Sequence, residues 1–167
     1  GNVYVSQAKR QVTGLVGVPA AFAGPSEVVV IGDDTVPAEL CATDIVVQAE
    51  HGPGGLAWLV TWDEAVADAV DEAMARIVAG AERRTDIEAT LADGGYTVLV
   101  DGRDAALAVA NAIAPEHLQL MTADPAALVP LVRNAGAVFC GPWSPASLGD
   151  YAAGPSHVLP TFGSARF

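Results

Sequence analysis

The stretch VVQAEHGPGG places three polar side chains at the end of an apolar, alanine-rich run, directly before a Gly-Pro break. On a helix, Gln48 and His51 are three residues apart and share a face, whereas Glu50 points elsewhere. Histidine nitrogen is a good zinc ligand, and a glutamine carbonyl oxygen is a weak one. The spacing alone therefore leaves two interpretations open, a metal site or a solvated helix end.

A second candidate is the pair Glu116-His117, which follows Pro115 at the start of an apolar run. A carboxylate beside an imidazole supplies two proton acceptors of different basicity, as general acid–base catalysis requires. Adjacent residues on a strand point to opposite faces, but in the loop that enters a strand both can face one crevice. The alternative interpretation is a solvated turn.

Three further polar residues lie among glycines and prolines. Asp150 in SLGDYAAGPSH is either a ligand or the former of an Asx turn. Ser26 in AGPSEVVV either directs its hydroxyl at a ligand or simply precedes a strand. His157 has an equally punctuated setting, which is also compatible with an ordinary surface histidine.

The elements that must position these residues alternate between short β-branched runs and longer helical patterns. This alternation predicts parallel βαβ units in a single domain over 1–167, of class α/β with a three-layer α/β/α arrangement. Such sheets commonly bind ligands beyond the carboxyl ends of their strands. Residues 142–167 are rich in Gly, Pro and Ser and are expected to form loops. The expected strands are 27–32, 56–61, 96–100, 117–122 and 136–141, and the expected helices are 2–13, 37–51, 63–80, 81–92, 103–113 and 124–134.

Composition excludes some classes of function. The net charge of −12 argues against nucleic-acid binding, which needs a basic surface. There is no apolar stretch of membrane-spanning length and no signal-peptide pattern, so we expect no membrane partner and a cytoplasmic location. Neither GxGxxG nor GxxxxGK[ST] occurs. Cys41 and Cys140 are expected to be small buried hydrophobes.

Several motifs taken together resemble one family, histidinol dehydrogenase, in their order and approximate spacing. The resemblance covers the whole chain, and the combination of QAEH, PEH and GDYxxGxxHVLPT is specific to that family. The motifs are GNVYVSQAKRQV, AGPSEVVVIGDD, QAEHGP, IAPEHLQ, GPWSPASLGDYAAGPSHVLPT and GSARF.

The resemblance implies an oxidoreductase of histidine biosynthesis. Members of the family oxidise L-histidinol to L-histidine through an aldehyde, with NAD as the oxidant in both steps and a zinc ion in the site, and they are homodimers. Their nucleotide-binding domains are incomplete Rossmann-like folds, so the missing GxGxxG is no objection.

The motifs also imply roles for individual residues. Glu116 and His117 match the acid–base pair, with His117 taking the hydroxyl proton and Glu116 activating water. Gln48, His51 and Asp150 match zinc ligands that also contact the substrate. Substrate contacts are implied for Ser26, His117 and His157, and an NAD contact is implied for Asn2.

The chain also departs from the family pattern. It is well under half the length typical of members, and it lacks the N-terminal region and the C-terminal tail, which supplies a further zinc-ligand histidine. We therefore expect the isolated chain to be inactive or nearly so. Two alternatives are a non-catalytic α/β scaffold domain and a metal-dependent hydrolase in which Glu116 activates water without NAD.

Overall fold

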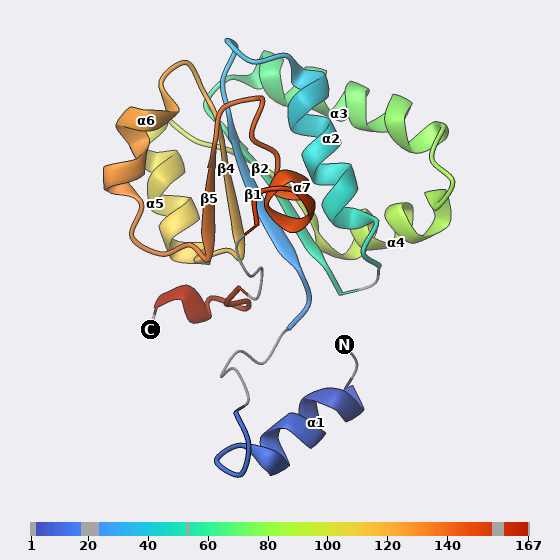
Figure 1. The fold of residues 1–167 in the computed structure, drawn as a ribbon. Coiled ribbons are helices and arrows are strands. Elements are labelled where there is room, and N and C mark those ends of the chain that lie inside the picture. Colours follow the sequence, from blue (N-terminus) through green and yellow to red (C-terminus); the bar gives the residue numbers. More distant parts are fainter. Residues whose placement is uncertain (1–2, 18–23, 53, 155–158, 167) are drawn as a thin grey trace.

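A parallel five-stranded sheet forms the centre of the protein (Figure 1). The structure, a computed structural model, describes residues 3–17, 24–52, 54–154 and 159–166. The strand order is β3-β2-β1-β4-β5, which is the order of a doubly wound nucleotide-binding sheet without its sixth strand. The strands are β1 (Glu27–Gly32), β2 (Leu56–Thr61), β3 (Gly95–Leu99), β4 (His117–Met121) and β5 (Ala137–Cys140).

Helices cover both faces of this sheet, so the predicted three-layer α/β class is confirmed (Figure 1). Helices α2, α3 and α4 pack on one face, and α5 and α6 pack on the other. No helix in the described part of the chain is long and apolar enough to cross a membrane. The α-helices are α1 (Val3–Val12), α2 (Ala38–Ala49), α3 (Glu64–Ala79), α4 (Arg84–Gly94), α5 (Arg103–Ile113), α6 (Pro125–Leu128) and α7 (Ala146–Tyr151).

The apolar run EVVVIG forms the central strand β1, and this position explains why its residues do not alternate between apolar and polar. All six of its residues are buried, because β1 has a strand on each side and helices above and below. Val28 and Val30 face α2 and α3, whereas Val29 and Ile31 face α5 and α6. Strands of parallel sheets covered on both faces have this pattern.

The C-terminal third of the chain differs from the sequence prediction in three places. Helix α6 ends at Leu128 and continues as a 3-10 turn over Val129–Leu131, because Pro130 has no N–H to extend the helical ladder. Helix α7 lies where loops were expected. Cys41 is buried as predicted, but Cys140 is exposed because it ends the edge strand β5.

Helix α7 depends on a contact with a residue of strand β4, which the sequence of the helix itself does not reveal. The buried side chain of Gln119 on β4 donates from Nε2 to the carbonyl oxygens of Gly141 and Ser144, at 3.1 and 3.2 Å. These bonds fix the loop after β5 against the sheet. The helix then begins directly after Pro145.

Candidate functional site

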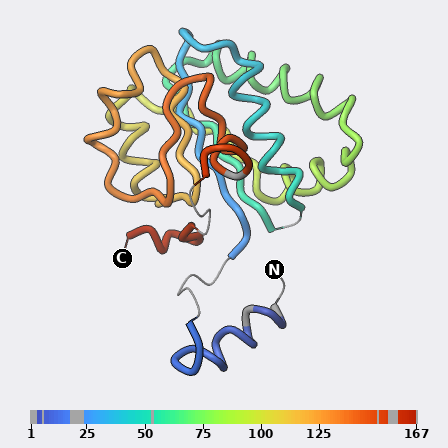
Figure 2. Tube along the Cα trace, in the orientation of Figure 1, coloured from blue at the N-terminus to red at the C-terminus, as the bar shows by residue number. Residues whose placement is uncertain are grey.

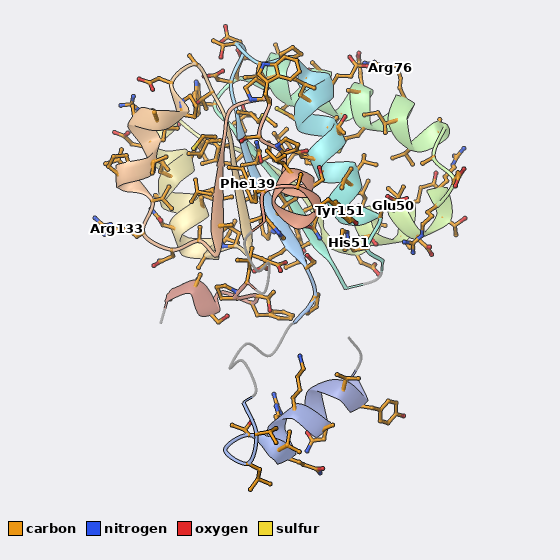
Figure 3. The ribbon with its side chains drawn as sticks, viewed as in Figure 1. Glu50, His51, Arg76, Arg133, Phe139 and Tyr151 are labelled. Atoms are coloured by element: carbon orange, nitrogen blue, oxygen red, sulfur yellow. The ribbon has the colours of Figure 1, made fainter. Side chains whose placement is uncertain are left out.

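The predicted polar residues of three separate segments meet in one cleft of about 200 Å³. Ser26 directly precedes β1. Gln48 lies in the last turn of α2, and His51 lies just after that helix. Glu116 directly precedes β4, and His117 is its first residue. His51 lies at the end of α2, towards α7 (Figure 3). The remaining lining residues are Val28, Asp44, Val47, Ala146 and Ser147.

The cleft lies at the amino ends of the strands, the lower edge of the sheet in Figure 1. This differs from the expectation that ligands bind beyond the carboxyl ends. The reason is the βαβ connection, in which the helix runs antiparallel to its strands. The end of α2 therefore returns to the edge at which β1 and β4 begin, and residues at helix ends and strand starts become neighbours.

The carboxylate of Glu116 is held by two donors from the start of β1. Ser26 Oγ donates to Glu116 Oε2 at 2.6 Å, and the backbone N–H of Glu27 donates to the same oxygen at 3.1 Å. Ser26 Oγ also lies 3.5 Å from Gln48 Oε1. Ser26 therefore connects the acid of the predicted pair with the amide at the end of α2.

His117 is buried next to this carboxylate. Its Nδ1 lies 3.0 Å from the carbonyl oxygen of Glu27 and 3.5 Å from Glu116 Oε2. Both neighbours are acceptors, so the geometry favours the tautomer with the proton on Nδ1. In that tautomer Nε2 carries the lone pair that can accept a proton. Glu116 and His117 both line the same cleft, which is possible because they lie where the chain enters a strand and not in its middle.

Two residues at the end of α2 carry atoms that can ligate a divalent metal. His51 Nδ1 lies 3.1 Å from the carbonyl oxygen of Val47, which favours a proton on Nδ1 and leaves Nε2 as the ligating nitrogen. Gln48 is only 5% exposed, and its Nε2 has no hydrogen-bond partner within the described residues. The described residues contain no cluster of three or more His, Cys, Asp or Glu with the geometry of a metal site.

Three predicted site residues cannot be placed. Asp150 belongs to helix α7, but its side chain lies outside what the structure describes. Asn2 and His157 also lie outside the described residues. Their predicted roles as zinc ligand, NAD contact and substrate contact stay predictions.

Asp44 is a site residue that sequence reasoning missed. It lines the cleft one turn before Gln48 on α2, and its Oδ2 has no hydrogen-bond partner within the described residues. Burial raises the pKa of Asp44 from 3.8 to about 6. The spacing of Asp44, Gln48 and His51, four and then three residues, is a one-face helical pattern that could have identified it.

Glu27 is the second missed residue. Its side chain lies behind the cleft, and its exposure is 3%. Burial raises its pKa, and the backbone N–H groups of Glu116, Phe162 and Gly163 oppose that rise. Because its partners are far away in sequence, no local pattern marks it.

Together, these features define an α/β domain whose doubly wound sheet carries a polar cleft with a buried Glu116-His117 pair. The sequence model of the histidinol dehydrogenase family matches residues 1–167, and the chain belongs to this family.

Curated relatives and a solved structure agree with this assignment. The chain is 50% identical over its full length to the histidinol dehydrogenase of Rhizobium meliloti (strain 1021) and 48% identical to that of Moorella thermoacetica. It covers 38% and 39% of those relatives. The crystal structure of the Elizabethkingia anophelis histidinol dehydrogenase superposes with a TM-score of 0.94 at 35% identity, over 99% of this chain and 38% of that one. The chain therefore spans under two fifths of the proteins that it matches.

The raised pKa of Asp44 predicts that ionisation of its carboxyl group lowers the free energy of unfolding as the pH rises. Since the folded-state pKa of about 6 lies above the ordinary value of 3.8, the stability linked to this group is present below pH 4 and is lost as the pH rises through 6. In zinc-free chain, Asp44→Asn should raise the free energy of unfolding at pH 7 by about 1–2 kcal/mol, allowing for solvent screening. Urea unfolding at pH 4 and pH 7 measures this difference.

The matched control is Asp68→Asn, which changes an exposed acid on α3. It should leave the stability unchanged within about 0.5 kcal/mol at both pH values. An Asp44→Asn variant that is no more stable than the wild type at pH 7 would contradict the raised pKa assigned to Asp44.

Proposed function

We propose that this chain is part of a zinc-dependent histidinol dehydrogenase, which oxidises L-histidinol to L-histidine through histidinaldehyde with NAD. One observation carries the proposal beyond family membership. The hydroxyl of Ser26 lies 2.6 Å from the Glu116 carboxylate, and that carboxylate lies 3.5 Å from His117 Nδ1, in the cleft shared with Gln48 and His51. From the family, we also propose a homodimer in the cytoplasm.

In the alcohol step, His117 is the base. The substrate hydroxyl loses its proton to His117 Nε2, because Nδ1 already donates to the carbonyl oxygen of Glu27. The carbonyl of Glu27 stabilises the imidazolium that forms. The carbon of the alcohol loses a hydride in the same step and becomes the aldehyde.

In the aldehyde step, Glu116 is the base. Its carboxylate takes a proton from water, and the hydroxide equivalent adds to the aldehyde carbon. The hydrate anion then loses a second hydride to NAD, and the carboxylic acid that forms releases a proton to give the carboxylate of histidine. The donors from Ser26 and Glu27 hold the carboxylate at a fixed position during the attack.

Gln48 Oε1 and His51 Nε2 would hold the zinc, with Asp150 as the third ligand that the motif implies. When bound, zinc orients the imidazole and amine of the substrate, and NAD accepts the hydride. Asp44 adds a carboxylate to the same face of α2, which favours a divalent cation and a cationic amine in this cleft. Ser26 and His157 are proposed as further substrate contacts, and Asn2 as an NAD contact.

A second candidate is that the 167-residue chain alone is a folded scaffold without turnover. This is favoured by the length comparison, since the chain spans only 38% of the Rhizobium meliloti relative. The two candidates differ in the polypeptide to which they apply. The complete gene product should be active, whereas this chain alone should not be.

The activity test uses the complete gene product and follows NADH formation with and without L-histidinol. His117→Asn should lower kcat by about 10²- to 10⁴-fold, the usual effect of losing a general base. Glu116→Gln should slow the second step selectively, so that histidinaldehyde accumulates and the NADH formed per histidinol consumed falls. Glu50→Ala is the control, since Glu50 lies outside the cleft. A wild-type protein without histidinol-dependent NADH formation would contradict the proposed function.

Zinc binding can be tested on the 167-residue chain without reference to activity. Competition with a chromophoric chelator should show zinc affinity that falls by about 10-fold or more in His51→Ala, because the imidazole at the helix end is lost. Glu50→Ala again serves as the control and should bind zinc as the wild type does. Equal affinities in the wild type and His51→Ala would show that His51 is not a ligand.

A further inference from the structure

Glu27 and Glu116 bind each other reciprocally at the amino ends of β1 and β4. The backbone N–H of Glu116 donates to Glu27 Oε1 at 3.2 Å, and the backbone N–H of Glu27 donates to Glu116 Oε2 at 3.1 Å. These bonds lie just before the first paired residues of the two strands, Val28 and His117. Each glutamate side chain therefore fixes the backbone of the other.

The same carboxylate of Glu27 also meets a turn from the C-terminal segment. The backbone N–H groups of Phe162 and Gly163 are directed at this carboxylate and oppose the rise in its pKa. Both residues have positive φ, 53° and 67°, and such a turn presents successive N–H groups to one anion. The segment 159–166 runs below the lower edge of the sheet, where β1 and β4 begin (Figure 2).

Neighbouring contacts show that this turn packs closely on the entry to β1. Thr161 Oγ1 accepts the backbone N–H of Gly24 at 2.8 Å. A Cβ at Gly24 would lie 2.5 Å from Phe162 Cδ2 and 2.6 Å from Thr161 Oγ1, so a side chain there would require the side chains of this turn to move. The glycine of the AGPSE motif therefore leaves room for the turn that lies at the entry to β1.

Burying a carboxylate costs free energy, so packing alone does not explain a glutamate at this position. Burial raises the pKa of Glu27, which is the sign of that cost, and an apolar side chain of similar size would avoid it. Glu27 is also absent from the lining of the cleft, so it does not face a ligand there. What its carboxylate provides is a hydrogen bond from the N–H of Glu116 and an electrostatic attraction for the N–H groups of the turn at Phe162-Gly163.

We propose that Glu27 is a positioning residue for the acid–base pair. Its carboxylate joins the backbone of Glu116 to the turn at Phe162-Gly163, so that the proposed catalytic base keeps one position relative to the segment that follows α7. This inference rests on the proposed function, because a positioning role for Glu27 requires that Glu116 acts as a catalytic base. The expected signature is a loss in kcat at nearly constant KM, since Glu27 orients the base and binds no substrate.

The test is Glu27→Gln in the complete gene product. Glutamine keeps one acceptor oxygen, but it replaces the other carboxylate oxygen by an NH₂ group and removes the charge that attracts the N–H groups of the turn. We expect kcat for histidinol oxidation to fall about 10- to 100-fold, as for a small displacement of a reacting group, with KM within about threefold. Hydrogen exchange at the amide of Glu116, which bonds to the Glu27 carboxylate, should become faster.

The matched control is Thr161→Val, which removes the bond to Gly24 in the same turn but touches neither glutamate. It should leave kcat within about threefold, an effect too small for a displaced reacting group. A folded Glu27→Gln variant with wild-type kcat would overturn the inference, as would an equal loss of kcat in Thr161→Val. If Glu27→Gln does not fold, Glu27→Asp decides, because it keeps the charge but is one methylene shorter. Wild-type kcat in that variant would overturn the inference, and a reduced kcat at constant KM would support it.

Failure of the proposed function can be told apart from failure of this inference. If the wild-type protein does not oxidise histidinol, the proposed function fails on its own. The amide-exchange comparison of Glu27→Gln with Thr161→Val then still tests the positioning role. Unchanged exchange at Glu116 in Glu27→Gln would overturn it, and faster exchange confined to that variant would support it.

Discussion

The hydrogen bonds that converge on the Glu116 carboxylate are the contacts on which the arrangement of this site depends. A buried carboxylate is tolerated only when donors surround it. Here the donors are the hydroxyl of Ser26 and the N–H of Glu27, which belong to the entry of β1, whereas Glu116 belongs to the entry of β4. The β1–β4 ladder places these two entries side by side, and the bonds to this one group fix them against each other. His117 and the end of α2 then meet at the same place.

The direction of the chain explains why this happens at the amino edge of the sheet. In a parallel sheet every crossover helix ends where the strands begin, so a polar helix end and polar strand entries share one edge. The cleft collects Asp44, Gln48 and His51 from the helix and Ser26 and Glu116 from the entries. This acidic setting suits a divalent cation and a protonated amine, which are the partners that the proposed reaction requires.

The fold was largely predictable from the sequence, because its signals are local. The run EVVVIG predicted a buried strand, and α5 spans the predicted range, Arg103–Ile113. Helix α7 was missed because its start depends on Gln119, a residue from another strand. Cys140 was expected to be buried, which was wrong because the sequence does not mark β5 as an edge strand.

The site was predictable only in part. The motifs identified Ser26, Gln48, His51, Glu116 and His117, and the structure brings these five together. They did not identify Glu27, whose partner Glu116 is 89 residues away and whose role exists only in the folded chain. Asp44 was missed for a different reason. A single aspartate in a helix is usually a solvated residue, and only the folded structure shows that one of its carboxylate oxygens is buried.

The most direct measurement is a double-mutant cycle between Ser26→Ala and Glu116→Gln, read as kcat/KM for histidinol in the complete gene product. If the two residues act as one unit through their 2.6 Å hydrogen bond, their effects should be non-additive by about 1–3 kcal/mol. Ser26→Ala would then cost much less activity when Glu116 is already replaced. Additive effects, within about 0.3 kcal/mol, would contradict the account, because Ser26 and Glu116 would then act independently.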